Sequence, residues 1–337
     1  MEHNSHQPPV LADVARIAGV SVSTVSRTLT GRTPVSPDLR AKVESAVAQL
    51  GYRPNAAAQA LVSGRRSTIA ILARNTLRYG YAATLQGVEE SARAAGFTVT
   101  IAVVESDAPA DISAAVGLVL SQPLAGAIVI EFDAVGVATL EALPMSLPVV
   151  AVAGALRPSG PRPHVFLDDE TGGRLATEHL LGLGHRTVHH VAIPATRARS
   201  GRSWGWRQAL RAAGVDAPAV VRAGYDPSSG YTAGLALARL RGVTAVLCGN
   251  DEIAIGVTRA LREQGRRVPE DVSVVGFDDQ PFAEMWAPPL TTVAQDFTEL
   301  GRRAVSLLTS WLDSGEKPSD WVGQPSLVVR ESTAPPR

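Results

Sequence analysis

The sequence has a single cysteine, Cys248, among its 337 residues. One thiol cannot form an intrachain disulfide, so the sequence gives no support to an oxidising compartment. No apolar run approaches the roughly 20 residues of a membrane-spanning helix. The first ten residues, MEHNSHQPPV, lack the basic stretch and the following apolar stretch of a secretory signal. We therefore expect a cytoplasmic protein that does not contact a membrane.

The molecule as a whole also lacks net charge, because 32 basic residues balance 32 acidic ones. The charges are nevertheless unevenly distributed. Residues 1–66 contain eight basic and four acidic side chains, which leaves 24 basic and 28 acidic ones for residues 67–337. A basic N-terminal region on an acidic remainder is expected of a protein that touches a polyanion, such as a nucleic acid, with one end.

The basic region begins with a helical pattern. Apolar residues at the i, i+3, i+4 and i+7 positions of a helix are Leu11, Val14, Ala15 and Ala18. Gly19 follows where a helix commonly ends in a left-handed residue, and Ser21 is a favourable N-cap for a second helix. Val22, Val25 and Leu29 are spaced to pack the second helix against the first. With a third helix over residues 38–51, capped by Ser36 or Asp38, the pattern predicts a helix-turn-helix.

The second helix carries small polar side chains that a DNA major groove can accept. Its candidates for DNA contact are Val22, Ser23, Thr24, Ser26 and Arg27. Arg27 could donate to a guanine edge or a phosphate, Ser23 could bond to several bases, and Val22 could contact a thymine methyl group. The alternative is an ordinary three-helix domain with a polar surface, because short patterns of this kind also arise by chance.

The segments around this pattern indicate a family. The stretches DVARIAGVSVSTVSRTLTG, VSPDLRAKVESAVAQLGYRPN and AAAQALVSGRRSTIAIL closely resemble the DNA-binding domain and hinge of the LacI/GalR family of bacterial transcription regulators. The resemblance implies a DNA-binding domain over residues 1–54, a hinge helix and linker over residues 55–66, and an effector-binding and dimerisation domain over residues 67–337.

The resemblance further implies that the hinge orders into a helix on operator DNA. The matching residues are Asn55, Ala58 and Leu61, of which Leu61 takes the place of a wedge in the minor groove. An apolar wedge kinks a duplex by unstacking a base step. A helix this short is not stable alone, so a flexible linker is the alternative for the protein without DNA.

Residues 67–337 alternate between apolar strand patterns and amphipathic helix patterns, which predicts an α/β fold with parallel sheets covered on both faces. We expect a first lobe from residues 67–154 and a second lobe that begins at the strand HVFLDD, residues 164–169. The helix over residues 296–315 and the strand over residues 326–331 are expected to return to the first lobe. The family resemblance extends over this region and implies a core like that of periplasmic binding proteins, with a cleft between the carboxyl ends of the strands.

The resemblance also implies which residues hold the effector. The residues that match cleft positions of the family are Arg202, Asn250, Asp278, Gln295 and Phe297. Asp278 could accept from two vicinal hydroxyls and Arg202 could donate through its fixed fork, which suits a sugar or a sugar derivative. A helix cap or a loop acid is the alternative for Asp278, and core packing is the alternative for Phe297. Tyr225 is a further candidate, for stacking on a sugar ring.

Two positions depart from the family pattern. Ala153 stands where many sugar-responsive members have an acid, and Arg74 ends the first strand where a small polar residue is usual. If Arg74 faces the cleft as an effector-binding residue, an anionic ligand such as a sugar acid becomes the expectation. If Arg74 instead pairs with a surface acid, the ligand is expected to be neutral.

Other classes of protein explain less of the sequence. His185, His189 and His190 fall in and beside an apolar strand, and a metal site would need a converging carboxylate or thiol. Cys248 lies in an apolar strand and resembles a small core residue more than a nucleophile. We therefore expect no catalytic residues, metal or cofactor. A transport protein would account for residues 67–337 but not for the helix-turn-helix.

The sequence thus predicts a sequence-specific transcription regulator, and the family resemblance favours a repressor. Two half-sites related by a two-fold axis imply a homodimer on a palindromic double-stranded operator. The expected effector is a small polar molecule bound between the two lobes.

Overall fold

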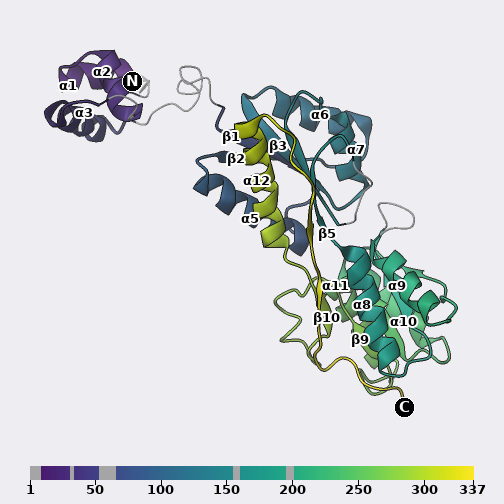
Figure 1. Cartoon of the computed structure of the whole chain (residues 1–337). Coiled ribbons are helices and arrows are strands. Elements are labelled where there is room, and N and C mark those ends of the chain that lie inside the picture. Colours follow the sequence, from purple (N-terminus) through teal and green to yellow (C-terminus); the bar gives the residue numbers. More distant parts are fainter. Residues whose placement is uncertain (1–8, 31–33, 53–65, 155–159, 195–200) are drawn as a thin grey trace, which may run out of the picture. The chain divides into compact units, whose positions relative to one another are not determined.

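The computed structural model describes residues 9–30, 34–52, 66–154, 160–194 and 201–337. The chain divides into two compact units, Met1–Ser67 and Thr68–Arg337 (Figure 1). The hinge candidates Asn55, Ala58 and Leu61 lie outside the described residues. The domain boundaries predicted at residues 54 and 66 stay predictions.

The first unit is built from three helices, α1 (Leu11–Ala18), α2 (Val22–Thr30) and α3 (Pro37–Leu50). Its core forms where Val14, Val25 and Val43 meet, each fully buried. Gly19 ends α1 in the left-handed region with a φ of 66°, as the sequence predicted. Residue Ser21 caps α2, because its Oγ accepts a 3.1 Å hydrogen bond from the backbone N–H of Thr24.

Two details of the first unit differ from the expectation. Val22 is 47% exposed and lies outside the core. Ser36 occupies the N-cap position of α3, but its side chain makes no capping hydrogen bond. Pro37 follows at the first helical position, where its fixed φ already suits a helix and no N–H needs a partner.

The second unit contains a first lobe around a six-stranded parallel sheet in the order β11-β5-β4-β3-β1-β2. Its strands are β1 (Thr68–Ala73), β2 (Thr98–Val103), β3 (Leu124–Glu131), β4 (Val149–Ala153), β5 (His164–Leu167) and β11 (Trp321–Gly323). Successive side chains point to opposite faces. Ile69 and Ile71 therefore join the core under α5 (Tyr79–Ala94) and α12 (Phe297–Ser314), whereas Ala70 and Leu72 join the core under α6 (Pro109–Leu120) and α7 (Ala134–Ala142).

The second lobe repeats this plan around the four-stranded parallel sheet β7-β6-β8-β9. The strands are β6 (His189–Ala192), β7 (Val221–Arg222), β8 (Ala245–Cys248) and β9 (Ser273–Val275). One face is covered by α8 (Asp169–Gly182) and α9 (Gly201–Ala212), and the other by α10 (Pro227–Ala238) and α11 (Asp251–Glu263). A separate antiparallel pair joins β10 (Thr292–Ala294) to β12 (Ser326–Val328).

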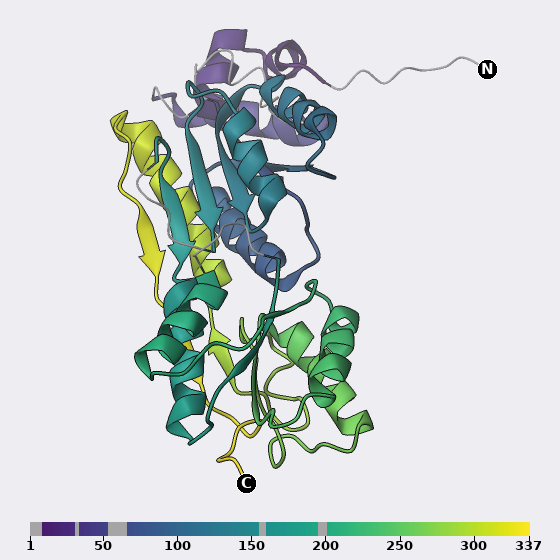
Figure 2. The same ribbon diagram turned by 90° about the vertical axis from the view of Figure 1, so that its right-hand side faces the viewer.

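The chain passes between the lobes three times, after β5, after β10 and after β11 (Figure 2). Two predictions about this arrangement were wrong, and one helix was missed. The strand over residues 164–169 belongs to the first lobe, since β5 pairs with β4 and β11. The strand over residues 326–331 pairs with β10 instead of returning to the first sheet, although α12 does return and packs against α5. The helix α7 between β3 and β4 was not predicted.

Candidate functional site

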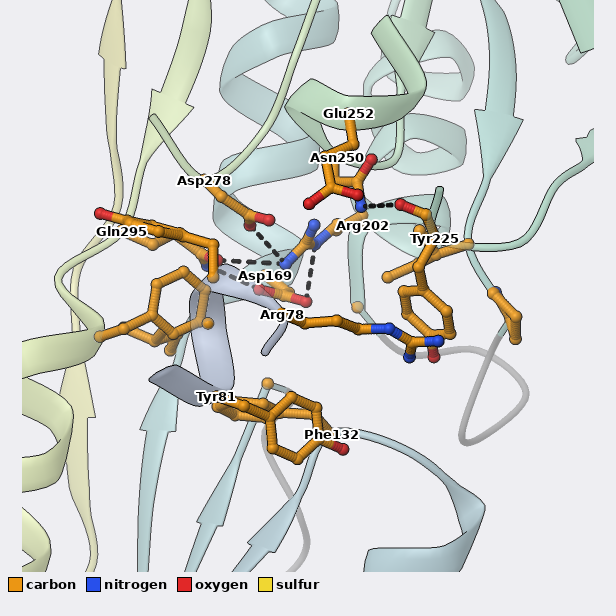
Figure 3. A pocket seen from close by; sticks show the side chains of 18 of the residues that line it. Arg78, Tyr81, Phe132, Asp169, Arg202, Tyr225, Asn250, Glu252, Asp278 and Gln295 are labelled. Carbon is orange, nitrogen blue, oxygen red and sulfur yellow. Dashed lines mark hydrogen bonds and ion pairs between the residues drawn. The ribbon is translucent and has the colours of Figure 1, made fainter. Parts of the chain in front are cut away.

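A pocket lies in the second unit where the chain crosses between its lobes (Figure 3). Four of the residues that line it sit at the ends of crossing segments, namely Leu167, Asp169, Gln295 and Phe297. The remaining lining residues come from both lobes. The pocket therefore occupies the edge that open α/β sheets offer to ligands.

Arg202 is the centre of the polar side of the pocket. Its Nε donates to Asp169 Oδ2 at 3.0 Å, and its Nη2 lies 2.9 Å from Asp278 Oδ1 and 3.1 Å from Gln295 Oε1. Its Nη1 donates to the carbonyl oxygen of Gly249. Gln295 closes the network by donating to Asp169 Oδ1 at 2.6 Å. One guanidinium thus orients two carboxylates and one amide around the cavity.

Two glycines explain why Asp169 and Arg202 meet. Asp169 is the first residue of α8, and Arg202 is the second residue of α9. A Cβ on Gly205 would lie 1.9 Å from the Glu170 carbonyl oxygen, and a Cβ on Gly173 would lie 2.2 Å from the Arg202 carbonyl oxygen. Only glycine permits this approach, which places the first turns of the two helices side by side.

Burial changes the proton affinity of the acids in this network. Burial raises the pKa of Asp278 to about 8, although the attraction of Arg202 acts in the opposite direction. The pKa of Asp169 is raised for the same reason and with the same opposing partner. Asp251 lies behind the network, with a 2.5 Å hydrogen bond from Thr292 Oγ1, and burial raises its pKa to about 7.

Asn250 joins the polar side from the start of α11. Its Oδ1 accepts from the backbone N–H of Ile253 at 2.8 Å and so caps the helix. Its Nδ2 donates to the carbonyl oxygen of Tyr225 at 2.9 Å and fixes the loop before α10. Asn250 therefore positions Tyr225 at the pocket as well as lining the pocket itself.

Aromatic rings form much of the opposite side. The chain has only eleven Phe and Tyr residues, and five of them line this pocket: Tyr79, Tyr81, Phe132, Tyr225 and Phe297. Phe132 is in edge contact with Tyr81 at 5.2 Å and with Phe297 at 5.7 Å between ring centroids. The Tyr81 hydroxyl donates to Asp133 at 2.9 Å and is therefore turned away from ligand binding. This side offers a ligand apolar surface.

The structure brings together five of the residues predicted to hold an effector. Arg202, Asn250, Asp278, Gln295 and Phe297 all line the pocket, and so does Tyr225. Arg74 is not among the lining residues. Its side chain is 45% exposed, and its Nη1 lies 3.9 Å from Asp133 Oδ2. Ala153 is buried in β4.

Other lining residues were not predicted. Glu131 is the last residue of β3, and Asp169 comes two residues after the end of β5. Their position at strand ends of the first sheet is the signal that could have identified them. Glu131 Oε2 lies 3.2 Å from His164 Nε2 in a buried pair. His190 is fully buried at the pocket, with its Nε2 2.8 Å from Ser203 Oγ. Arg78, which immediately precedes α5, also lines the pocket and was not predicted.

The DNA-contact candidates of the first unit lie on α2. Val22, Ser23 and Arg27 are exposed, and their helix is the second of the helix-turn-helix. Thr24 and Ser26 are half-buried, and Thr24 Oγ1 lies 2.9 Å from Ser21 Oγ within the cap of the helix. Val22, Ser23 and Arg27 are therefore the accessible members of the predicted set.

His185 and Cys248 contribute to the packing of the second lobe. His185 lies between Thr244 Oγ1 at 3.0 Å and Ser273 Oγ at 3.1 Å, and Cys248 is fully buried in β8. Within the described ranges, His, Cys, Asp and Glu side chains form no group of three or more that could hold a metal ion. The described helices include none with the length and apolar character needed to cross a membrane.

Comparison with known proteins identifies the family. A model of the lacI family of bacterial regulatory proteins matches residues 10–55, and a model of the periplasmic binding protein-like domain matches residues 177–333. The lactose operon repressor of Escherichia coli (strain K12) is 31% identical over 334 residues, which cover 98% of this chain and 92% of that repressor. The chain belongs to the LacI family.

Solved structures of LacI-family proteins share the fold. The lac repressor dimer bound to operator and the anti-inducer ONPF superimposes with a TM-score of 0.88 at 31% identity, over 97% of this chain and 100% of that one. The complex of the transcriptional regulator CelR with cellobiose gives a TM-score of 0.70 at 33% identity, over 96% of this chain and 99% of that one. The LacI family consists of DNA-binding transcription regulators and not of enzymes.

Proposed function

We propose that this LacI-family regulator represses transcription by binding a palindromic operator as a homodimer. A small polar effector, of the sugar class, controls that binding from the pocket between the lobes. The observation that carries the proposal is the presence on one chain of a helix-turn-helix and of a pocket centred on Arg202 and Asp278. The lac repressor dimer on its operator and the CelR–cellobiose complex support the two halves of the proposal.

Each group of residues has a proposed role. Val22, Ser23 and Arg27 contact base edges and phosphates in the major groove, with Thr24 and Ser26 behind them. In the pocket, Asp278 accepts hydrogen bonds from effector hydroxyls while Arg202, Gln295 and Asn250 hold the surrounding groups in place. Phe297 supplies apolar surface on the other side.

The hinge completes the proposed DNA interface. Asn55, Ala58 and Leu61 enter the minor groove when the regulator binds its operator. The domain boundaries at residues 54 and 66 belong to this proposal. We place the protein in the cytoplasm at the nucleoid because chromosomal DNA is its proposed partner, and we assign it no catalytic reaction.

Operator selection tests the proposal. The purified full chain is incubated with fragmented genomic DNA, bound fragments are sequenced, and the recovered site is titrated at rising salt concentration. We expect a palindromic site bound by two chains, with an affinity that falls steeply as salt rises because Lys and Arg release counterions from the phosphates. A binding curve that ignores salt, or the recovery of no shared sequence, would remove the regulator function.

A further inference from the structure

The residues carried over from the family leave few hydrogen-bond donors for an effector. Arg202 already donates to Asp169, Gly249 and Gln295, and it is ion-paired with Asp278. A guanidinium has five N–H groups in a fixed plane, so at most two remain for a ligand, and one of these is on Nη2, which lies 2.9 Å from Asp278 Oδ1. Asn250 donates to the Tyr225 carbonyl. The polar side of the pocket therefore offers mainly acceptors.

Arg78 supplies the missing donors. It is the N-cap residue of α5 in the first lobe, where Asn75 Oδ1 accepts from its backbone N–H at 2.8 Å. Its side chain extends along the pocket toward the second lobe (Figure 3). Among the described residues, no oxygen lies within hydrogen-bond or ion-pair distance of its guanidinium.

The ring of Tyr225 fixes the direction of those donors. The guanidinium carbon of Arg78 lies 4.2 Å from the Tyr225 ring centroid, in a cation–π contact that joins the two lobes. The ring covers one face of the guanidinium, so the N–H groups project from its edge. The Tyr225 hydroxyl is buried and has no hydrogen-bond partner among the described residues. The Arg78 guanidinium and the Tyr225 hydroxyl at this end of the pocket can therefore both hydrogen-bond to a ligand.

The charge of the lining decides what that partner can be. Four carboxylates line the pocket, on Glu131, Asp169, Glu252 and Asp278, against the guanidinium groups of Arg78 and Arg202. Carboxyl groups thus outnumber guanidinium groups, although burial raises the pKa of Asp169 and Glu252 as well as that of Asp278. Burial lowers the pKa of His190 to about 4, so this imidazole adds no positive charge near neutral pH. A carboxylate or phosphate on the ligand would face more carboxyl groups than guanidinium groups.

We propose that Arg78 is a specificity-determining residue that donates to hydroxyl or ring oxygens of a neutral, hydroxyl-rich effector, and that the site rejects acidic forms of the same sugar. Asp278 accepts from hydroxyl groups at one end of this ligand. Arg78, held against the Tyr225 ring, donates to ligand oxygens at another end. The inference rests on the proposed function and deepens it, because it names the ligand class of the same pocket.

Calorimetry on the full chain tests the inference with paired probes. The pairs are glucose with glucuronic acid, galactose with galacturonic acid, ribose with ribose 5-phosphate, and cellobiose with cellobionic acid. We expect the neutral member of at least one pair to bind about tenfold or more tightly than its acid. We expect Arg78→Leu to weaken that binding about tenfold or more, and Arg78→Lys to restore only part of the loss, because an ammonium lacks the planar fork.

Matched variants separate recognition from folding. Arg93→Leu removes an exposed arginine of the same helix, which pairs with Glu89, and is expected to leave the affinity unchanged. Thermal melting of every variant checks that it is folded. Unchanged affinity in a folded Arg78→Leu protein, or tighter binding of an acidic probe, overturns the inference.

The variant Asp278→Asn distinguishes this inference from the proposed function. If Asp278→Asn weakens binding of the neutral sugar but Arg78→Leu does not, the effector site stands and the role of Arg78 fails. If no probe of either kind binds, the sugar effector and the role of Arg78 fail together.

Discussion

Asp278 combines three features that rarely occur together in one side chain. It is buried, it is ion-paired with Arg202, and its backbone has a φ of 102°, in a region that residues other than glycine seldom adopt. Strained backbone of this kind costs free energy and persists where the surroundings enforce it, commonly at ligand sites. Asp251 contributes to that enforcement, because its Oδ2 accepts from the backbone N–H of Gln280 at 2.7 Å.

Asp278→Asn is expected to weaken effector binding. The substitution keeps the shape of the side chain but replaces one of its two oxygens, which can accept from effector hydroxyls, by an amide NH2 group, which cannot accept. The loss of affinity should be about tenfold or more, measured by calorimetry with the neutral sugar that binds best. Operator binding by the ligand-free protein should be unchanged. An equal loss of operator binding would show that the variant has disturbed the whole molecule.

The raised pKa of Asp278 also predicts how stability depends on pH. An aspartate of the unfolded chain ionises near 3.8, so between pH 4 and about 8 the folded state holds a proton that the unfolded state has lost. The free energy of unfolding therefore falls as pH rises through this window, by up to about 1.4 kcal/mol per pH unit for one group.

Histidines limit the range in which this slope is visible. Burial lowers the pKa of His190 to about 4 from 6.5, which makes stability rise with pH below 6.5. We therefore expect a net fall only between about pH 6.5 and 8, to which Asp251 also contributes. Urea unfolding across that range should show a shallower slope for Asp278→Asn than for the wild type. Identical slopes for the two proteins would contradict the raised pKa of Asp278.

At the scale of elements, the approach of α8 and α9 determines the geometry of the site. Gly205→Ala would place a methyl carbon 1.9 Å from the Glu170 carbonyl oxygen, which is far closer than van der Waals contact allows. We expect the helices to separate, with a loss of about 1–3 kcal/mol in the free energy of unfolding and weaker effector binding. Denaturant unfolding and calorimetry measure the two effects.

Gly182→Ala is the matched control for this prediction. Gly182 is the last residue of α8, and a Cβ there would meet nothing within 4 Å. Because alanine favours a helix more than glycine does, this variant should be as stable as the wild type or more stable, by up to about 1 kcal/mol. Equal destabilisation by both substitutions would mean that the contact between the helices is not the cause.

The elements show why much of the fold, but not all of it, is predictable from sequence. Periodic apolar positions and caps such as Ser21 identify most helices and strands because these signals are local. The helix α7 shows no such periodicity, because residues 134–142 are apolar on most sides and charged only at Glu141. β5 was assigned to the wrong lobe because only the short connection over residues 154–163 separates it from β4, whereas parallel neighbours usually need a longer crossover.

The candidate site likewise contains residues that the sequence predicts and residues that it does not. Asn250 and Asp278 follow strands of the second sheet, and resemblance to the family supplies their roles. Asp169 was missed although it lies just after β5, whereas Arg78 and Tyr81 were not predicted because each reaches the pocket through tertiary packing. Arg78 in particular faces Tyr225, which is far away in the sequence, and no local pattern relates these two residues.

At the scale of the whole molecule, effector and operator bind different units of the chain. Two sites that influence each other must do so reciprocally: the factor by which the effector changes operator affinity equals the factor by which the operator changes effector affinity. Such coupling needs an element whose state both ligands bias. The predicted hinge, residues 55–66, is the candidate for that element, because its resemblance to the family hinge implies ordering on DNA.

Leu61→Ala tests this role of the hinge. The apolar insert that supports the DNA bend would be lost, so specific operator binding should weaken by on the order of a few kcal/mol, measured by fluorescence anisotropy on the selected palindrome. Binding to random DNA should change little, because phosphate contacts dominate it. Effector affinity should be unchanged, because Leu61 lies outside the effector-binding domain that the sequence predicts over residues 67–337.

Leu118→Ala provides the control for the same chemical change. Leu118 is an exposed leucine of α6, 61% accessible, and its removal should leave both operator and effector binding unchanged. If Leu61→Ala also lowered effector affinity, unfolding would explain the loss of operator binding better than a missing wedge. If Leu61→Ala bound the palindrome as tightly as the wild type, the hinge would have no part in operator recognition, and the helix-turn-helix alone would supply the specificity.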